Sequence, residues 1–401
     1  MDIRSLLETQ RQIHLLPPFA LSATAREQLV SLDWDEVLHA HDQAGPQRPA
    51  TAGCEIFPVE ATLPDAASQD KFRQEGLSLL SQGKVAFVLM AGGQGSRLGH
   101  SGPKGSAPLD FPNGTTLFHL LVRRMLRLQQ ECGQLPAFLV MTSPENDAPT
   151  RAWFEANAPQ LPAGSVQFFQ QGVMPALDTQ GRVLLSPEGT LALAPDGNGG
   201  IFRALTQSGE LERLAQRGVE WLHIAGVDNA LSLPCDPVFV GFAQKSGLGV
   251  ASKTVERTEP GEKAGVFRRD AQGNGGVAEY TEIGELAAAR AADGSLLYRE
   301  ANIASHLVRL ELVQRFGTQG LPWHLARKQL PHLDPDTGLP GRELVCKYER
   351  FLFDAFPLAG PMALLRVERS REFAPIKNAQ GADSPATALA ALLANGETFS
   401  G

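Results

Sequence analysis

A glycine-rich loop with two cations follows a short apolar run in the first quarter of the chain. Residues 89–105 read Leu-Met-Ala-Gly-Gly-Gln-Gly-Ser-Arg-Leu-Gly-His-Ser-Gly-Pro-Lys-Gly. The glycines let the backbone approach a ligand closely and turn N–H groups toward phosphate oxygens. Arg97 and Lys104 would add charge-assisted hydrogen bonds from the same loop. The loop therefore predicts phosphate binding, and the alternative is a glycine-rich connection with two incidental cations.

The two common phosphate-binding patterns do not fit this loop. G-x-x-x-x-G-K-[ST] is absent, because Pro103 precedes Lys104 and Gly105 follows it. G-x-G-x-x-G also fails, since Leu98 stands where the third glycine is needed. A nicotinamide-dependent oxidoreductase is therefore disfavoured.

A lone carboxylate follows a second apolar run farther along the chain. Residues 219–227 read VEWLHIAGV and are followed by Asp228. Open α/β sheets bind ligands at the carboxyl ends of their strands. One carboxylate there suits Mg²⁺, which takes one or two protein carboxylates and completes its shell with phosphate oxygens and water. The alternative is that Asp228 caps the next turn.

Strands that alternate with helices must position these residues. Short apolar runs rich in β-forming residues predict buried strands at 85–90, 137–142, 166–169, 219–227 and 248–255. Apolar residues at helical spacing predict helices at 22–40, 71–82, 115–132, 201–217 and 384–395. This alternation indicates an α/β fold, with a mixed, mainly parallel sheet flanked by helices.

Composition limits the class of protein. The 401 residues carry a net charge of −8, which disfavours a general nucleic-acid-binding role. Cys54, Cys132, Cys235 and Cys346 are too scattered for a C-x-x-C pair, so we expect a reducing compartment. The first residues lack the pattern of a signal peptide, and no apolar run approaches the ~20 residues that a membrane span needs. We therefore expect a cytoplasmic protein.

Eight ordered blocks carry a resemblance to a known family. The loop pattern L-x-x-G-G-x-G-[ST]-R-L-G followed by P-K-G is typical of the UDP-sugar pyrophosphorylases, nucleotidyltransferases of glycosyltransferase-A-like fold. The other blocks are QQGVMPALD (170–178), APDGNGGIFRAL (194–205), VDN (227–229), AEYTEI (278–283), ANIASH (301–306), ERFLFDAF (349–356) and EFAPIKNA (372–379). Together they are most similar to the eukaryotic-type UDP-N-acetylhexosamine pyrophosphorylases.

The resemblance implies roles for particular residues. It implies nucleotide binding by Met90, Ala91, Gly92, Gly93, Gly95, Gln171 and Gly197. It implies sugar binding by Asn198, Gly265, Glu279, Asn302, Phe351 and Phe353. It further implies that Arg97, Lys104 and Lys377 act on the phosphates and that Asp228 holds Mg²⁺ over the α-phosphate.

From the sequence alone, several of these residues have ordinary alternatives. Residues 195–200 are a turn sequence, and a turn needs no ligand. The default for Lys377 is a surface lysine. Phe351 and Phe353 alternate as on a strand, where core packing is their default. Ala301 stands where the family has a glycine before Asn302, which would narrow the sugar pocket by one methyl group.

The resemblance implies a Mg²⁺-dependent reaction between two small molecules. UTP and N-acetylglucosamine 1-phosphate would give UDP-N-acetylglucosamine and pyrophosphate by in-line attack on the α-phosphate. The alternatives are a uridylyltransferase for glucose or galactose 1-phosphate, a broad UDP-sugar pyrophosphorylase, and a nucleotide-sugar-binding protein without turnover. We expect no nucleic-acid or membrane partner, and the oligomeric state stays open, with a monomer allowed.

The expected organisation follows the order of the chain. Residues 1–80 form a helical N-terminal segment, residues 81–380 form the catalytic nucleotidyltransferase domain, and residues 381–401 form a C-terminal helix and tail.

Overall fold

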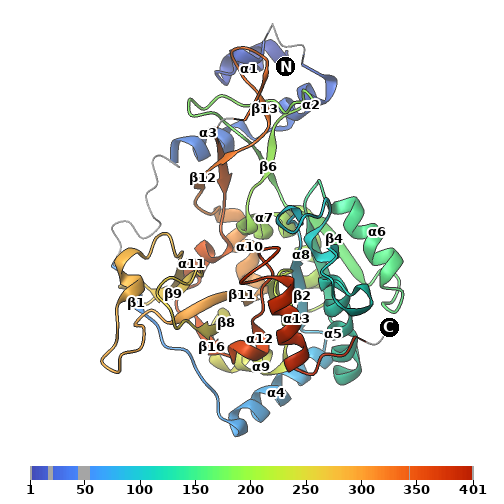
Figure 1. Cartoon of the computed structure of the whole chain (residues 1–401), viewed down its shortest axis with the longest axis vertical. Coiled ribbons are helices and arrows are strands. Elements are labelled where there is room, and N and C mark those ends of the chain that lie inside the picture. The colour runs from blue at the N-terminus through green and yellow to red at the C-terminus, as the bar shows by residue number, and fades with distance from the viewer. Residues whose placement is uncertain (1, 17–20, 44–54, 343, 400–401) are drawn as a thin grey trace. The chain divides into compact units, whose positions relative to one another are not determined.

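The structure of the protein is a computed structural model that describes residues 2–16, 21–43, 55–342 and 344–399 (Figure 1). Its contacts divide the chain into two units. The larger unit comprises residues 50–171, 201–320 and 353–401, and the smaller unit comprises residues 1–49, 172–200 and 321–352. The units therefore interleave along the chain, whereas the segments expected from the sequence follow one another.

The smaller unit combines N-terminal helices with short antiparallel strand pairs. Its helices are α1 (Ile3–Thr9), α2 (Ala23–Ser31) and α3 (Trp34–Gln43). Its strand pairs are β5 (Val173–Pro175) with β6 (Leu193–Pro195), β12 (His324–Gln329) with β15 (Leu344–Glu349), and β13 (His332–Leu333) with β14 (Pro340–Gly341). Leu7, Leu29, Leu177, Trp323 and Tyr348 belong to its apolar core.

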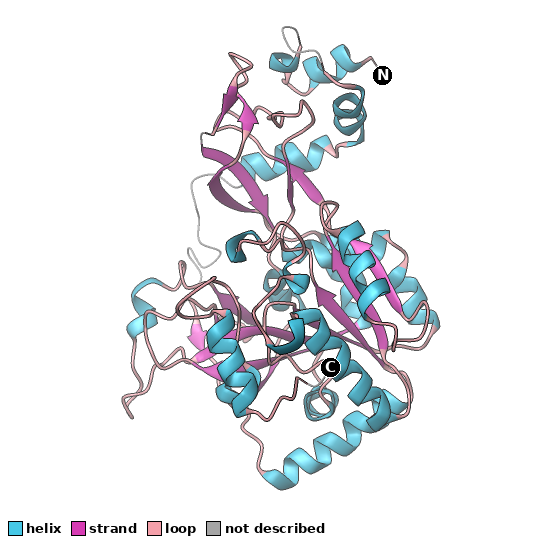
Figure 2. Cartoon of the chain, turned by 45° about the vertical axis from the view of Figure 1, so that its right-hand side comes forward, coloured by secondary structure: helices cyan, strands magenta, loops and turns pink. Residues whose placement is uncertain are grey.

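A mixed sheet, ten-stranded over the residues that the structure describes, organises the larger unit (Figure 2). Its central strands β7, β2, β3 and β4 are mutually parallel, and β11 joins β7 in the antiparallel direction. The strands are β1 (Phe57–Pro58), β2 (Val85–Met90), β3 (Ala137–Thr142), β4 (Val166–Gln170), β7 (Trp221–Gly226), β8 (Val250–Glu256), β9 (Val266–Arg269), β10 (Gly275–Ala278), β11 (Glu300–Arg309) and β16 (Ala363–Arg366). The expected α/β fold class and each of the five strands expected in this sheet are confirmed.

The segments that carry many of the predicted site residues lie at one edge of this sheet. The carboxyl ends of parallel strands meet at the same edge, so the chain leaves β2, β3, β4 and β7 on one side. Strand β8 runs antiparallel to β11, and β16 runs parallel to β8, so both end at that edge as well. The amino-terminal half of β11 lies there too, because Ser305 pairs with Ala225 near the end of β7.

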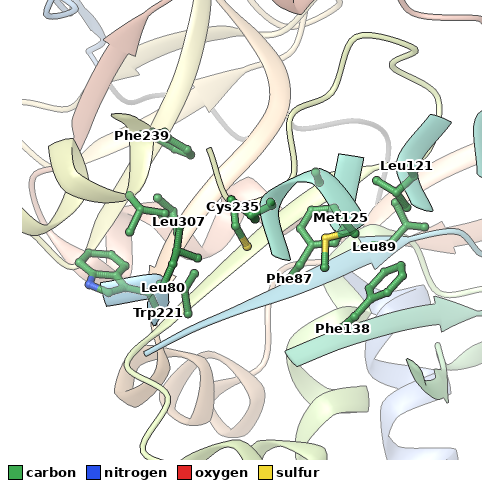
Figure 3. Packing of buried hydrophobic residues seen from close by; sticks show 14 of the residues in the cluster. Leu80, Phe87, Leu89, Leu121, Met125, Phe138, Trp221, Cys235, Phe239 and Leu307 are labelled. Atoms are coloured by element: carbon green, nitrogen blue, oxygen red, sulfur yellow. The ribbon is translucent and has the colours of Figure 1, made fainter. Parts of the chain in front are cut away.

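Helices flank the sheet of the larger unit. They are α4 (Ala66–Ser81), α5 (Leu117–Cys132), α6 (Asp147–Asn157), α7 (Ile201–Gln207), α8 (Glu210–Gln216), α9 (Pro237–Ser246), α10 (Leu310–Gln319), α11 (Phe356–Ala359), α12 (Arg369–Glu372) and α13 (Pro385–Ala394). Figure 3 shows Leu121 and Met125 of α5 close to Phe87 and Leu89 of β2 in the main core. None of the helices in the described ranges is long and apolar enough to cross a membrane.

Three helix predictions need correction. The helix expected at 201–217 is two helices, because Gly209 adopts φ +77° between α7 and α8. The helix expected at 22–40 is also two, since Leu32 is extended between α2 and α3. The helix expected from residue 71 begins five residues earlier, where the Asp65 carboxylate accepts a hydrogen bond from the Ser68 N–H at 2.7 Å and caps α4.

Two glycines bring α4 and α9 into backbone contact. A Cβ added at Gly76 of α4 would lie 1.9 Å from the Pro237 carbonyl oxygen, and a Cβ added at Gly241 of α9 would lie 1.8 Å from the Phe72 carbonyl oxygen. Neither contact is possible for a real side chain, so both glycines are required at this crossing. Because α9 follows the loop that begins at Asp228, this packing also supports that loop.

We predict that Gly76→Ala destabilises the protein by about 1–3 kcal/mol, because the added methyl group forces the two helix backbones apart. This loss should exceed the gain of up to about 1 kcal/mol that alanine brings to a helix interior. Urea unfolding gives the free energies of unfolding. Gly261→Ala is the control, because nothing lies within 4 Å of its added Cβ. Equal stabilities of the two variants would contradict the close packing of α4 on α9.

Candidate active site

The glycine-rich loop leaves β2 and folds back on itself. The Gly95 N–H donates to the Gly102 carbonyl at 2.8 Å, and the Lys104 N–H donates to the Gly93 carbonyl at 3.1 Å. A Cβ added at Gly105 would lie 2.2 Å from the Phe118 ring, so the end of the loop is pressed onto α5. The loop therefore has a defined shape of its own.

The start of the loop lies against a residue that was predicted to read the base. A Cβ added at Gly92 would lie 2.7 Å from the Gln171 side-chain oxygen, whereas nothing lies within 4 Å of one added at Gly93. Gln171 is buried directly after β4. Met90 ends β2, and Ala91 donates a backbone hydrogen bond to β3. The predicted nucleotide-binding residues of the larger unit thus come together at one sheet edge.

Each cation of the loop lies on a short 3₁₀ turn. Arg97 belongs to η2 (Ser96–Leu98), and Lys104 belongs to η3 (Lys104–Ser106). The Lys104 ammonium lies 3.8 Å from an Asp228 carboxylate oxygen, and its side chain is 18% exposed. Burial lowers the pKa of Lys104, the charges of Arg97 and Lys377 also lower it, and Asp228 acts to raise it. Three predicted phosphate-binding cations therefore influence one another beside the predicted metal ligand.

The residues at Asp228 fit a metal that arrives with phosphate ligands. Among the described residues, no group of three or more His, Cys, Asp or Glu side chains could hold a metal ion. Asp228 is 34% exposed and follows β7, so its carboxylate has room for one ion with water or phosphate as further ligands. Mg²⁺ accepts such a donor set.

Lys377 reaches this edge from a part of the chain about 150 residues away. The Ile376 N–H donates to the Asp228 carbonyl at 2.9 Å, and the Ala230 N–H donates to the Ala374 carbonyl at 3.0 Å. This antiparallel pairing places Lys377 directly beyond the residue that bonds to Asp228. Its ammonium lies 3.5 Å from an Asp383 carboxylate oxygen, and its side chain is 37% exposed.

Three predicted sugar-binding residues cluster at the β9–β10–β11 end of the sheet. The Asn302 N–H donates to the Gly265 carbonyl at 2.8 Å. A Cβ added at Gly265 would lie 2.8 Å from a Glu279 carboxylate oxygen, so the absent side chain leaves space for that group. Ala301 is fully buried beside them.

The smaller unit contains Gly197, Asn198 and Phe351. Gly197 adopts φ +90°, and a Cβ there would lie 2.4 Å from the Arg350 carbonyl oxygen. The Asn198 side-chain oxygen accepts a hydrogen bond from the Leu352 N–H at 2.9 Å. The segment 195–200 thus leaves β6 at Pro195 and turns at the 3₁₀ helix η5 (Asn198–Gly200), and it is bonded to the segment that carries Phe351.

The expectation that Phe351 and Phe353 alternate on a strand is wrong. Strand β15 ends at Glu349, and Phe353 lies in the 3₁₀ turn η7 (Leu352–Ala355). The Phe351 ring lies 4.4 Å from the His324 ring. Phe353 is buried in the larger unit, with 7% exposure.

Comparison with known proteins shows to which family the chain belongs. A sequence model of the UTP–glucose-1-phosphate uridylyltransferase family (UDPGP) matches residues 51–396. The chain belongs to this family.

Relatives in the uridylyltransferase family resemble the chain over most of its length. The human UDP-N-acetylhexosamine pyrophosphorylase-like protein 1 is 37% identical over 98% of this chain and 83% of that protein. The UDP-N-acetylglucosamine pyrophosphorylase of Saccharomyces cerevisiae is 36% identical over 86% of this chain and 77% of that protein. The solved structure of the Trypanosoma brucei UDP-N-acetylglucosamine pyrophosphorylase with an inhibitor has a TM-score of 0.83 and 29% identity, over 98% and 85% of the two chains. The resemblance seen in the sequence is confirmed.

One supporting residue of the candidate site lies next to the glycine-rich loop and was not predicted. The buried Asn146 side chain donates to the Ala91 carbonyl at 2.9 Å and accepts from the Ser143 N–H at 2.7 Å. It therefore fixes the first turn of the loop to the end of β3. Its place shortly after a buried strand was the available signal.

Asn229, next to Asp228, is a second supporting residue that sequence reasoning missed. Its amide donates to the Glu372 carbonyl at 2.7 Å and accepts from the Ala374 N–H at 2.9 Å. Glu372 in turn forms an ion pair with the buried Lys253, which also contacts Asp236 at 2.7 Å. Asn229 and this charged group hold the loop after β7 to the segment that carries Lys377.

We predict that Asn229→Ala costs about 1–3 kcal/mol of unfolding free energy, because partly buried backbone groups lose their hydrogen-bond partners. Hydrogen exchange at the Ala374 amide should become faster, since its acceptor is removed. Denaturant unfolding and exchange measured by mass spectrometry test both effects. Asn395→Ala is the matched control, because it removes an amide that donates to exposed backbone carbonyls. An unchanged rate of hydrogen exchange at the Ala374 amide would contradict the role of Asn229 in holding the two segments together.

Proposed function

We propose that this protein is a uridylyltransferase that makes UDP-N-acetylglucosamine and pyrophosphate from UTP and N-acetylglucosamine 1-phosphate. The observation that carries the proposal is the Lys104–Asp228 pair, which lies 3.8 Å apart between the glycine-rich loop and the Lys377 segment. The names of the yeast and trypanosomal relatives support N-acetylglucosamine as the sugar, and the name of the human relative supports an N-acetylhexosamine. The description of the family model names glucose 1-phosphate, which keeps that substrate as the alternative.

Catalysis in this proposal consists of positioning and charge neutralisation. An oxygen of the sugar phosphate attacks the α-phosphorus of UTP in line, and the bond from that phosphorus to the departing pyrophosphate breaks. The backbone of Gly92–Gly95 and the Arg97 guanidinium hold the triphosphate. Lys104 neutralises charge on the leaving pyrophosphate, and Lys377 neutralises charge on the α-phosphate. Such preorganised charges account for a large part of many enzymes' rate enhancement.

Mg²⁺ is the cofactor that these residues fit. Asp228 would hold it at the end of β7, with phosphate oxygens of the substrate as further ligands. Bound there, the ion would add positive charge at the α-phosphate during the transfer.

The remaining residues recognise the two ends of the substrates. Gln171 binds uracil, which offers both acceptors and an N–H. Gly265, Glu279 and Asn302 of the larger unit contact the sugar, and Phe353 of the same unit lies at the N-acetyl group. The buried free thiols of Cys132, Cys235 and Cys346 support a reducing, cytoplasmic compartment, while Cys54 lies outside the described residues.

Release of pyrophosphate from UTP and Mg²⁺ with a panel of sugar 1-phosphates tests the proposal. We expect the highest kcat/KM with N-acetylglucosamine 1-phosphate. A preference for glucose or galactose 1-phosphate would keep the mechanism and replace the sugar. No release with any sugar, together with measurable UDP-sugar binding, would contradict an enzyme and indicate a binding protein.

We predict that Lys104→Met and Arg97→Ala each lower kcat by about 10²–10³-fold, as loss of a transition-state charge partner typically does. Lys71→Met is the matched control, because Lys71 is exposed on α4 and should leave the rate unchanged. Initial rates of pyrophosphate release measure the effect. A rate within a few-fold of the unmodified protein for Arg97→Ala would show that the glycine-rich loop does not bind the triphosphate.

A further inference from the structure

Strand β11 contains a bulge where it passes the end of β7. Asn302 pairs with Thr254 of β8, and His306 pairs with Ser252, so four steps along β11 match two steps along β8. Within this irregular stretch, Ala304 adopts φ +54°. A β-bulge inserts extra residues into one strand and redirects the neighbouring side chains, and bulges are over-represented next to active sites.

The conformation of Ala304 is unusual for a residue that carries a Cβ. Left-handed backbone geometry is common for glycine, tolerated by asparagine and aspartate, and costly for other residues. Such strained positions persist where the surrounding structure enforces them, and they gather at functional sites. Here the neighbouring registers with β7 and β8 hold the bulge from both sides.

The bulge determines which end of the Asn302 side chain can meet a ligand. The Ala304 N–H, which the bulge frees from the strand ladder, donates to the Asn302 side-chain oxygen at 2.8 Å. That oxygen therefore already accepts one backbone hydrogen bond, whereas the other end of the amide carries two N–H donors. The assignment of oxygen and nitrogen follows from this partner.

Ala304 also lies beside the predicted metal ligand. A Cβ added at Gly226 would lie 3.9 Å from the Ala304 Cβ and 2.9 Å from an Asp228 carboxylate oxygen. The bulge is thus at the carboxyl end of β7, between Asp228 and the group formed by Gly265, Glu279 and Asn302.

We propose that Ala304 is a positioning residue whose left-handed bulge makes Asn302 a hydrogen-bond donor to an acceptor oxygen of the sugar 1-phosphate. The inference rests on the proposed function, because that function places Asn302 at the sugar. It adds the direction of the hydrogen bond and the backbone conformation that enforces it. Substitutions that keep the left-handed conformation should preserve sugar recognition, and those that oppose it should weaken recognition while leaving the nucleotide site intact.

The test compares Ala304→Gly with Ala304→Val in the full-length protein. Glycine adopts positive φ without strain, whereas a β-branched valine strongly resists it. We expect valine to raise KM for the sugar 1-phosphate about tenfold, the order of one lost hydrogen bond, with KM for UTP within about twofold. Glycine should leave both values near those of the unmodified protein.

A second comparison asks whether Ala304 acts through Asn302. In an Asn302→Ala background, Ala304→Val should cause no further rise in KM for the sugar 1-phosphate, because the side chain that it positions is already gone. An additional tenfold rise there, or equal effects of valine and glycine in the unmodified background, would overturn the proposal.

Two further measurements keep the outcomes distinct. If Ala304→Val does not fold, Asn302→Asp replaces it in the test. Aspartate still accepts a hydrogen bond from the Ala304 N–H but cannot donate one to the sugar. A KM for the sugar 1-phosphate equal to that of the unmodified protein would then overturn the proposal. An unmodified protein with no turnover on any sugar 1-phosphate would contradict the proposed function itself. An active protein in which a folded Ala304→Val is unchanged would contradict the role of the bulge alone.

Discussion

The backbone pairing of residues 228–230 with residues 374–376 is the constraint on which the candidate active site depends. Two hydrogen bonds, Ile376 N–H to Asp228 carbonyl and Ala230 N–H to Ala374 carbonyl, join segments that are far apart in sequence. Without them, Lys377 would be a lysine on a polar segment with no fixed relation to β7. With them, its position beside Asp228 follows from the geometry of the main chain, and the Asn229 amide and the buried Lys253 ion pairs reinforce it.

The charge arrangement at this edge favours a polyanionic ligand. The chain as a whole carries a net charge of −8, yet Lys104 is largely buried near Arg97 and Lys377. Burial and like charges lower the pKa of Lys104, which means that its ammonium form is held at a cost in the free protein. Phosphate oxygens would add to the counter-charge of Asp228, which lies 3.8 Å from the Lys104 ammonium. The positioning that is unfavourable in the free protein would therefore become favourable when a polyanionic ligand binds.

Local sequence patterns predicted much of the fold and the part of the candidate site that follows directly from the ends of strands. Strands 85–90 and 137–142 have the predicted bounds, because short apolar runs rich in β-forming residues and bounded by turn residues are typical of buried parallel strands. The placement of Asp228 at the carboxyl end of a strand likewise followed from the sequence.

Features set by distant contacts could not be predicted in the same way. The hydrogen bond between Asn229 and the Ala374 N–H and the positive φ of Ala304 depend on segments that come together only in the folded chain. Glycine 209 divides a helix whose apolar spacing is otherwise continuous, and the chain near Phe351 turns where alternation suggested a strand. The roles of Gly265, Glu279 and Asn302 came from family resemblance, and the structure adds their proximity.

A double-mutant cycle on Asp228 and Lys377 tests most directly whether the pairing of their segments places both groups on one phosphate. The values of kcat/KM for pyrophosphate release would be measured for Asp228→Asn, Lys377→Met and the double variant. The account predicts large losses in both single variants and a combined loss at least about tenfold smaller than their product, a coupling of about 1.4 kcal/mol. A Lys377→Met variant within a few-fold of the unmodified protein, or losses that simply multiply, would contradict it.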